Sequence, residues 1–558
     1  MPIAVGQPDT LIGLALAQFP RLSEAERRLL RAAPRGEMAW CGPSPFDTDV
    51  ANDPNGTQEW GAERSIHGVL LRWLCVDGRA KNLVDPKGVL VHAARVVGAI
   101  DISNVTVPFP LALKQCRLTD DFILLGAEIP QLSMEACSVQ RIHGDDAKFK
   151  SGLFLCKGFR ADGIVAVRGA QINGSFDCHG GTFRSNPGDK ERFDAGVALD
   201  ASEITVKGDV FLNGQFVANG EVRIVGARID QDLDCGTARL EQPHLEETSG
   251  GSWASLNADG VVVGNNTFLG DGFFAAGDVR FYGAQVAGSL ICVSGTFNKL
   301  NARAATIRGT FMWSGIANAQ SAQLILTDAN IGSINDEERS WPNHGRLNLD
   351  GFIYARITNG PTEAEERLKW LRLQDPFTPQ PYRQLAKVLA EAGDDRGSRA
   401  VLMEMESALR KGDPYWAVPA NLLEWTVGYG YAPERVFIPL IVFFGLGWVI
   451  YRRAMLAGRM VPTDRGAYEH FKRHSSSPPH YEAFCSGIYS LENSLPLVNL
   501  GQADLWQPDP SPFAIQKGRV WRRITSPGWL RGYRRFQIIV GWIIATLLVA
   551  GLTGIIRR

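Results

Sequence analysis

The sequence lacks the short motifs with which most enzymes hold a cofactor or activate a nucleophile. Its 558 residues contain no Walker phosphate loop, no GxSxG, and no GxGxxG between an expected strand and an expected helix. The nine cysteines form no CxxC pair, which argues against a zinc ribbon or a dithiol redox site. Most of them stand in apolar stretches, where they are expected to act as small buried side chains. We therefore expect no cofactor and no catalytic activity.

The chain also lacks a charge imbalance and a basic leader. Its 58 Lys and Arg residues are balanced by 59 Asp and Glu residues, so no overall basic field points to nucleic acid. The opening segment, MPIAVGQPDTLIGLALAQF, has no basic residues ahead of a short apolar patch, so no secretory signal is expected. We accordingly expect the N-terminal domains to lie in the cytoplasm.

The most regular feature that is present is a repeat of 57 residues. Three gap-free segments match one another, at 158–178, 215–235 and 272–292. Each contains apolar-x-apolar triplets typical of short strands, separated by Gly-Ala or Ala-x-Gly steps that supply tight turns. A fixed long period of this kind predicts a parallel β-solenoid in which like residues stack on like. The length of one coil stays open, because 57 is not a multiple of the finer spacing of 22.

The fold class expected is mainly β: a parallel β-helix solenoid with an α-helical N-terminal cap, a helical hairpin and a C-terminal two-helix transmembrane region. Residues 1–86 form the cap, where Ser23 to Glu26 make a capping box and 66–75 are expected to be a second helix. The solenoid spans 87–360. Residues 361–412 have amphipathic helical periodicity, broken at Ala392-Gly393, which predicts the hairpin. The last part, 413–558, is the membrane domain.

Two uncharged apolar runs near 436–451 and 536–556 are the expected membrane spans. The second is long enough to cross the hydrocarbon core, whereas the first is marginal. The missing leader favours a cytoplasmic position for both termini at a bacterial inner membrane. Clusters of arginine at both ends of the loop 452–535 would instead keep that loop inside. The orientation of the loop is left open.

The pentapeptide TVGYG at 426–430 matches the filter signature of potassium channels. A filter needs a membrane span and a pore helix before it, and only charged amphipathic helices precede this one. We therefore expect an aromatic, glycine-rich turn at the membrane interface instead of a filter. Its residues are Trp425, Gly428, Tyr429, Gly430 and Tyr431.

The spacing of apolar residues in 484–506 predicts a helix with one apolar face. That face comprises Phe484, Ile488, Leu491, Leu495 and Val498. In position the segment resembles the pore helix of a two-span channel, but Pro496 would break the helix and no repeated-glycine filter follows. An amphipathic helix at the membrane interface and a pore segment are the two interpretations. The residues concerned are Glu492, Asn493, Asn499, Gly501, Gln502 and Asp504.

Two further groups of side chains carry metal-binding or sugar-binding chemistry. His470 and His474 share a helical face, with His480 nearby, but no cysteine or carboxylate clearly completes a ligand set, so a solvated loop is expected. Asp177 and Asp234 recur at the period of 57, and Asp101 has a similar setting. In alternating strands such acids are expected to point to solvent.

Several motifs together resemble a bacterial membrane protein family. They are the VRGAQINGSFDC-type repeats, LNLDGFIYARI, PYRQLAKVLAEAG, VGYGYAP, SLENSLPLVNLGQADLW and VAGLTGIIRR. Members of that family are similar to pentapeptide-repeat proteins and are labelled uncharacterised or membrane-associated oxidoreductases. The resemblance supplies no catalytic residues, and the chain has no cofactor motif to match the oxidoreductase label. Its repeat also departs from strict five-residue spacing.

The function expected is that of a membrane-anchored β-solenoid scaffold or partner-binding protein without catalytic activity. Its partners would be the lipid bilayer, further copies of the chain in a homo-oligomer, and an unidentified protein bound along the solenoid, with no nucleic acid. One alternative is a two-span ion channel or pore gated by the cytoplasmic solenoid. Another is an enzyme with a site along the solenoid groove, which clustered polar residues in a concave pocket would favour.

Overall fold

The computed structural model describes residues 10–56, 60–185, 196–241, 244–246, 252–410, 425–426, 428–495, 497–510 and 526–553. The chain forms two compact units, Met1–Gly393 and Asp394–Arg558. The division between them falls inside the segment 361–412, for which the sequence predicts a hairpin.

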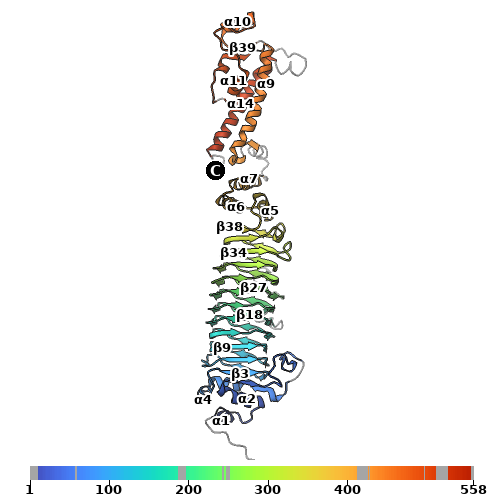
Figure 1. Ribbon diagram of the computed structural model, residues 1–558, viewed down its shortest axis with the longest axis vertical. Coiled ribbons are helices and arrows are strands. Elements are labelled where there is room, and N and C mark those ends of the chain that lie inside the picture. Colours follow the sequence, from blue (N-terminus) through green and yellow to red (C-terminus); the bar gives the residue numbers. More distant parts are fainter. Residues whose placement is uncertain are drawn as a thin grey trace, which may run out of the picture. The chain divides into compact units, whose positions relative to one another are not determined.

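The first unit is a parallel β-solenoid of about eleven turns, as the repeat predicted (Figure 1). Each coil hydrogen-bonds to the coils on either side of it through two parallel sheets. Phe154 pairs with Asp177, which pairs with Phe211 on the next coil. This in-register stacking satisfies the backbone groups of short strands that would be unstable alone.

The strands of the two sheets are short, and a coil contributes either one longer strand or two shorter ones to a sheet. The 18-stranded sheet contains β1 (Met38–Trp40), β3 (Val89–His92), β6 (Leu111–Lys114), β9 (Glu128–Glu135), β12 (Lys148–Phe154), β15 (Gln171–Ile172), β16 (Phe176–Asp177), β19 (Thr205–Val206), β20 (Val210–Phe211), β23 (Arg228–Ile229), β24 (Leu233–Asp234), β28 (Val262–Val263), β29 (Thr267–Phe268), β31 (Gln285–Val286), β32 (Leu290–Val293), β34 (Thr306–Ser314), β36 (Asn330–Asp336) and β38 (Ile353–Asn359). The 20-stranded sheet contains β2 (Ser65–His67), β4 (Arg95–Val97), β5 (Ile100–Asp101), β7 (Arg117–Leu118), β8 (Phe122–Ile123), β10 (Ser138–Val139), β11 (Ile142–His143), β13 (Arg160–Ala161), β14 (Val165–Ala166), β17 (Thr182–Arg184), β18 (Val197–Asp200), β21 (Val217–Asn219), β22 (Glu221–Arg223), β25 (Arg239–Leu240), β26 (His244–Glu246), β27 (Ser252–Asn257), β30 (Phe274–Arg280), β33 (Thr296–Asn301), β35 (Gln323–Ile325) and β37 (Leu347–Asn348).

The register explains why the sequence repeats every 57 residues. Cys178 stacks on Leu212, and Leu212 stacks on Cys235, because the residues just before them pair in the sheet. The first step is 34 residues long and the second is 23, which together make the period of 57. One repeat is therefore two coils, a longer one that includes 186–195 and a shorter one. The three repeat cysteines are all fully buried at equivalent positions, as predicted.

The coil interior is apolar and stacked. Phe183 lies between Phe159 and Phe216, with ring centroids 5.4 and 5.1 Å away. Offset aromatic stacks at this spacing stabilise a core beyond the area they bury. The Gly-Ala steps turn the corners: Gly169 has a left-handed φ of 65°, and the Ala170 that follows it is fully buried. Glycine adopts this conformation without strain, whereas Asp146 and Glu203 make the same left-handed corner in the neighbouring coils, both with a φ of 58°.

Helices close both ends of the solenoid. They are α1 (Leu11–Gln18), α2 (Glu24–Ala32), α3 (Gly68–Val76) and α4 (Gly78–Asn82) at the N-terminal end, and α5 (Ala364–Leu371) and α6 (Gln380–Glu391) after β38. The predicted capping box is present, since Ser23 and Glu26 bond each other's backbone N–H groups. The sheets begin at β1 and β2, within the segment that the sequence assigns to the cap.

A buried ion pair marks the C-terminal end of the solenoid. The guanidinium of Arg367 on α5 donates two hydrogen bonds to the carboxylate of Asp336 on β36, at 2.6 and 2.9 Å. Trp341 and Trp370 lie against the same guanidinium. Pairing and bidentate geometry compensate for the loss of water around both charges.

The second unit contains two helices that are long and apolar enough to cross a membrane, within Glu434–Leu456 and Pro527–Ala550. Its elements are α7 (Asp395–Arg410), η6 (Gly428–Gly430), η7 (Pro433–Val436), α9 (Phe437–Leu456), β39 (Met460–Pro462), α10 (Arg465–His474), α11 (Ser486–Ser494), α12 (Gln502–Leu505), β40 (Trp506–Pro508) and α14 (Pro527–Leu552). The first candidate span, marginal in the sequence at 436–451, extends to Leu456, five residues further. The antiparallel pair β39–β40 brings both sides of the intervening loop together.

Candidate functional site

The short helix α11 packs against both candidate spans. The Ser490 hydroxyl donates a 2.8 Å hydrogen bond to the carbonyl oxygen of Phe444, in the middle of α9. On the other side, a Cβ added at Gly541 of α14 would stand 2.6 Å from the Ser494 carbonyl oxygen. Glycine at this position therefore permits the backbones of α11 and α14 to approach closely, as small residues do between membrane helices.

The buried face of α11 is polar, which corrects the sequence prediction. Of the predicted apolar face, Phe484 and Leu495 pack against apolar clusters, but Ile488 is exposed and the helix ends at Ser494, before Leu495 and Val498. The buried residues are Tyr489, Ser490, Glu492, Asn493 and Ser494. Apolar periodicity identifies a buried face only when water is the surrounding solvent. In a helix surrounded by lipid the polar side chains turn toward other helices instead.

Gln537, in the second candidate span, forms hydrogen bonds with the polar face of α11. Gln537 is fully buried, and its amide Nε2 donates to the Ser494 hydroxyl at 2.8 Å and to Ser490 at 3.2 Å. The Tyr451 hydroxyl on α9 donates to the Gln537 Oε1 atom at 2.8 Å. The network thus joins α9, α11 and α14 through side chains that the sequence reasoning missed. A lone glutamine in an otherwise apolar run was the signal that could have found it.

The predicted pore or interface residues lie together at the end of α11. Glu492 Oε2 accepts a 2.8 Å hydrogen bond from the Ala503 backbone N–H, and Asn493 Oδ1 accepts one from the Arg534 guanidinium at 3.3 Å. Gln502 is fully buried, and its Oε1 accepts from the Cys485 backbone N–H. These contacts fix the segment after α11 against both α11 and α14.

The remaining predicted residues form a turn at the surface of the unit. Asn499 Oδ1 accepts from the Gly501 backbone N–H at 2.8 Å, and Asn499 Nδ2 donates to Asp504 at 3.4 Å. Gly501 has a left-handed φ of 82°. Leu497, Val498 and Leu500 are exposed beside this turn. A single chain therefore presents this segment outward.

The TVGYG segment forms a turn ahead of α9. Tyr429 adopts a left-handed φ of 53° and is buried, and the Arg410 guanidinium carbon lies 4.8 Å from the centre of its ring. Gly428 and Gly430 flank it in η6, Tyr431 is half-buried, and Trp425 is 63% exposed. Val427 lies outside the described residues. The position of this turn at a membrane interface stays a prediction.

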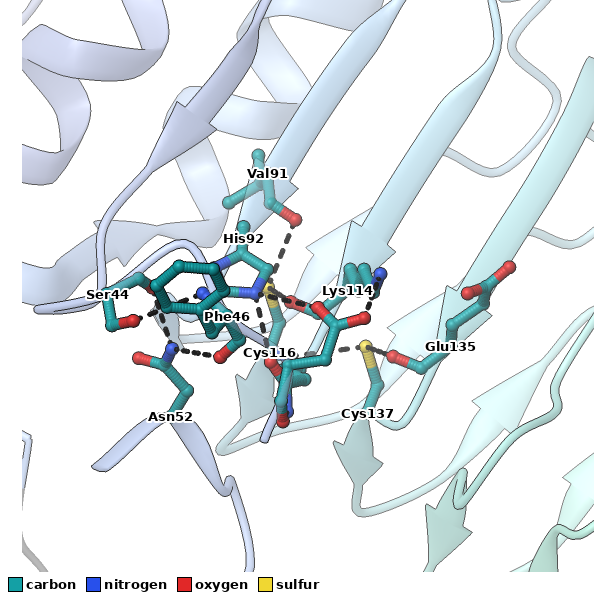
Figure 2. Close-up of polar contacts among 11 residues, drawn as sticks. Ser44, Phe46, Asn52, Val91, His92, Lys114, Cys116, Glu135 and Cys137 are labelled. Carbon is teal, nitrogen blue, oxygen red and sulfur yellow. Dashed lines mark hydrogen bonds and ion pairs between the residues drawn. The ribbon is translucent and has the colours of Figure 1, made fainter. Parts of the chain in front are cut away.

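A second polar cluster lies where the N-terminal cap meets the first coils (Figure 2). The ring of His92 is buried, and its Nε2 donates to the Gln115 Oε1 atom at 2.9 Å. Burial lowers the pKa of His92, so the ring is neutral at pH 7. Lys114 forms a 2.6 Å ion pair with Asp47, whose hydrogen bond from Lys114 holds the pKa of that carboxyl below its usual range.

This cluster ties the cap to the solenoid. Asn52 donates to the backbone carbonyls of Ser44 and Phe46, which holds the 44–52 loop over the coil. Gln115 donates to the Asp47 carbonyl from the other side. The neighbouring thiol of Cys137 is buried, which raises its pKa, and it bonds the Leu113 carbonyl. A neutral histidine and protonated thiols fit a structural closure of the solenoid end.

The candidate acids and histidines of the sequence have structural roles in the turns. Asp101 accepts from the Ser103 backbone N–H, and Asp177 and Asp234 accept from the backbone two residues further on in the same way. Such hydrogen bonds stabilise tight turns. The rings of His470 and His474 stack 4.5 Å apart on α10 and each bonds a backbone carbonyl. His480 is exposed.

A small cavity of about 20 Å³ lies between α3 and the first coils. Leu71, Cys75, Ile100 and Phe122 are among the side chains that line it, and none of its lining carries a charge. It has room for no more than a water or two, and an apolar cavity of this size stays dry.

No family model, curated protein or solved structure matches the chain.

Proposed function

We propose that the protein is a membrane-anchored scaffold that binds a partner protein along its solenoid and has no catalytic activity. The observation that carries this proposal is the different polarity of the surfaces of the two units. The solenoid exposes charged side chains, whereas α9 and α14 expose apolar ones such as Ile441 and Ile539 and enclose the polar face of α11 within a largely apolar core. The first arrangement suits water and the second suits lipid.

The outer surface of the solenoid supports a binding role. Opposite charges pair between neighbouring coils, as in Lys148 with Glu128 and Lys157 with Glu135, both at 3.0 Å. Arg141 and Asp121 repeat the arrangement. The result is a long, regular surface of mixed charge on a stiff backbone. Extended surfaces of this type are how other solenoids bind proteins.

The proposed setting is a bacterial inner membrane with the solenoid in the cytoplasm, and the bilayer and further copies of the chain as additional partners. The exposed apolar side chains of α9 and α14, which include Ile441, Leu446, Ile539 and Trp542, would contact lipid or another copy.

Photocrosslinking along the two sheets tests the scaffold. A photoreactive residue would replace, one at a time, the outward positions Lys148, Gln171, Arg228 and Gln285 of the 18-stranded sheet, which are linked coil to coil by register. The matched positions on the other sheet are Arg160, Arg239 and Thr296. In native membranes the proposal expects one discrete protein adduct from consecutive positions of one sheet. An equal background at every position would contradict it.

The re-entrant position of α11 favours a second candidate, a pore. A helix too short to cross a membrane, packed with its polar face between two spans, is the arrangement of a pore helix, and the segment after it is exposed. A passage would then require several chains around one axis. Ion flux into proteoliposomes tests this candidate. Flux that is lost in the variant Asn499→Ala/Asp504→Ala would favour the pore, and flux equal to that of empty liposomes would favour the scaffold.

A further inference from the structure

One coil of the solenoid brings together a cysteine, an aspartate and a histidine. A ligand atom from each of Cys156, Asp177 and His179 lies within 4.8 Å of the other two. Cys156 follows β12, and Asp177 and His179 lie at the end of β16 on the next coil, where Phe154 pairs with Asp177 in register. The three residue types are those that bind transition metals most often in proteins.

The hydrogen bonds leave ligand atoms available. Asp177 Oδ1 accepts from the His179 backbone N–H at 2.9 Å and lies 2.8 Å from the ring Nδ1 atom. The second carboxylate oxygen, Oδ2, has no donor among the described residues. Cys156 is buried, whereas the side chain of His179 is about one-third exposed, so the site reaches solvent on its histidine side.

The repeat provides an internal comparison. Residues 57 positions later stand at Asn213, Asp234 and Gly236, and Phe211 pairs with Asp234 as Phe154 pairs with Asp177. There the aspartate again accepts from the turn N–H, and its Oδ2 accepts from the Asn213 amide at 2.6 Å. The fold thus uses the aspartate in both copies, while the thiol and the imidazole occur in only one of the two.

The third copy of the repeat lacks the aspartate as well. Its residues at these positions are Gly270, Ile291 and Val293, and the same strands form around them. The backbone therefore requires none of the three side chains. Formation of the turn therefore does not explain why a cysteine, an aspartate and a histidine lie together in the first copy.

We propose that Cys156, Asp177 and His179 form a binding site for a zinc ion. The thiolate sulfur, one Asp177 oxygen and the His179 Nδ1 atom would supply three ligands, with the fourth position open to water. In a tetrahedral zinc site such ligand atoms stand about 3.3–3.6 Å apart, which small rotations of side chains already within 4.8 Å can reach. Binding releases the thiol proton to solvent as the sulfur–zinc bond forms, and the ring proton that faces Asp177 Oδ1 is exchanged through solvent from the His179 Nδ1 atom to Nε2, so that Nδ1 can bind the metal.

The charges around the site suit a divalent ion. One thiolate and one carboxylate neutralise Zn²⁺, so the partly buried complex carries no net charge. The nearest base, Lys157, already forms a 3.0 Å ion pair with Glu135. Without metal, burial raises the pKa of the Cys156 thiol to about 12, so the free thiol is protonated and a poor nucleophile at neutral pH.

Cobalt binding to the purified full chain in detergent tests the site directly. After treatment with a chelator, we expect about one Co²⁺ per chain, with tetrahedral visible bands and a near-ultraviolet thiolate-to-cobalt band that Zn²⁺ removes. The double variant Cys156→Asn/His179→Gly carries the residues of the second copy, so it should fold and lose both bands. Absence of the thiolate band in the parent chain, or its persistence in the variant, would overturn the proposal.

A variant of the second copy tests whether register alone makes the site. Asn213→Cys/Gly236→His would place the same three residue types two coils away, and Gly236 does not have a left-handed φ that would forbid a side chain. We expect cobalt stoichiometry to rise from about one to about two. A stoichiometry that stays at one, in a variant with an unchanged circular dichroism spectrum, would overturn the assignment of ligands by register.

Discussion

The two units of this chain expose different kinds of side chain, although both have apolar cores. In the solenoid, Leu212 lies buried between Cys178 and Cys235, and charged groups such as Lys148 face outward. In the second unit, Gln537 is fully buried while Ile539, two residues away on the same helix, is 60% exposed. The same physical rule acts in both, since each side chain avoids the solvent in which it is costly.

The comparison also shows two ways of joining elements. Coils of the solenoid are joined by backbone hydrogen bonds in register, so the interior needs only apolar side chains that stack. The helices of the second unit satisfy their own backbones and are joined by side-chain hydrogen bonds from Gln537, Tyr451 and Ser490. In the first unit the buried polar contacts described above lie at the two ends of the solenoid, at His92 and at the Arg367–Asp336 pair, whereas in the second unit they join the helices in the middle of the unit.

The largest effect is expected from a charge inside the solenoid. Leu212→Asp removes a buried side chain and leaves a carboxyl without a partner, which should lower the free energy of unfolding by about 4 kcal/mol or more. Urea unfolding followed by the β-sheet circular dichroism signal measures the change. Leu212→Cys is the matched control, because cysteine stands at the neighbouring positions of the stack, and its cost should be about half as large. Equal losses of unfolding free energy in the two variants would show that a buried charge is no more costly inside the solenoid than a smaller apolar side chain.

The converse change in the second unit should cost less. Gln537→Leu removes the hydrogen bonds that join three helices, and we expect a loss of about 1–3 kcal/mol, since single bonds of this kind contribute roughly 0.6–1.7 kcal/mol in membranes. Unfolding in mixtures of detergent and SDS provides the measurement, with Ile539→Leu on the exposed face as control. A stabilised Gln537→Leu variant would mean that the buried hydrogen bonds of Gln537 do not hold the second unit together.

A smaller effect is expected from pH at the solenoid end. Burial lowers the pKa of His92, so below its usual value of 6.5 the unfolded chain binds more protons there than the folded chain does. Stability from the neutral ring is therefore present above about pH 6.5 and falls by up to about 1.4 kcal/mol per pH unit below it. Thermal unfolding at pH 7.5 and 5.5 should show a steeper loss for the parent chain than for His92→Leu. Identical slopes would exclude His92 as the cause.

The smallest effect is expected on the outer surface of the solenoid. Lys148 and Glu128 form an exposed ion pair, so Lys148→Ala should change the free energy of unfolding by roughly 0.5 kcal/mol or less, and less still at high salt. The urea midpoint of the β-sheet signal is the readout. A loss above about 1 kcal/mol would show that coil-to-coil charges hold the solenoid together.

The sequence predicted the solenoid because like residues stack on like in successive coils. The equal spacing of Phe159, Phe216 and Phe273 therefore follows directly from the length of two coils. It could not yield the coil length, since one period holds a long coil and a short one. The apolar face predicted for 484–506 was right for Phe484 and Leu495, which pack against apolar clusters, and wrong for Ile488 and Val498, which are exposed because α11 buries a polar face instead. Gln537 and the Cys156–Asp177–His179 group each depend on residues that only the packing brings together.

The central claim is that α11 lies in lipid with its polar face turned inward, while the solenoid lies in water. A nitroxide label at Ile488 measures this most directly, in the full chain in a bilayer with the exposed Cys485 replaced by serine. Labels at Ile441 and Lys148 serve as the lipid and water references. The account predicts that the Ile488 label, like that at Ile441, is relaxed by oxygen and protected from a water-soluble nickel chelate. A label at Ile488 as accessible to nickel as that at Lys148 would contradict it.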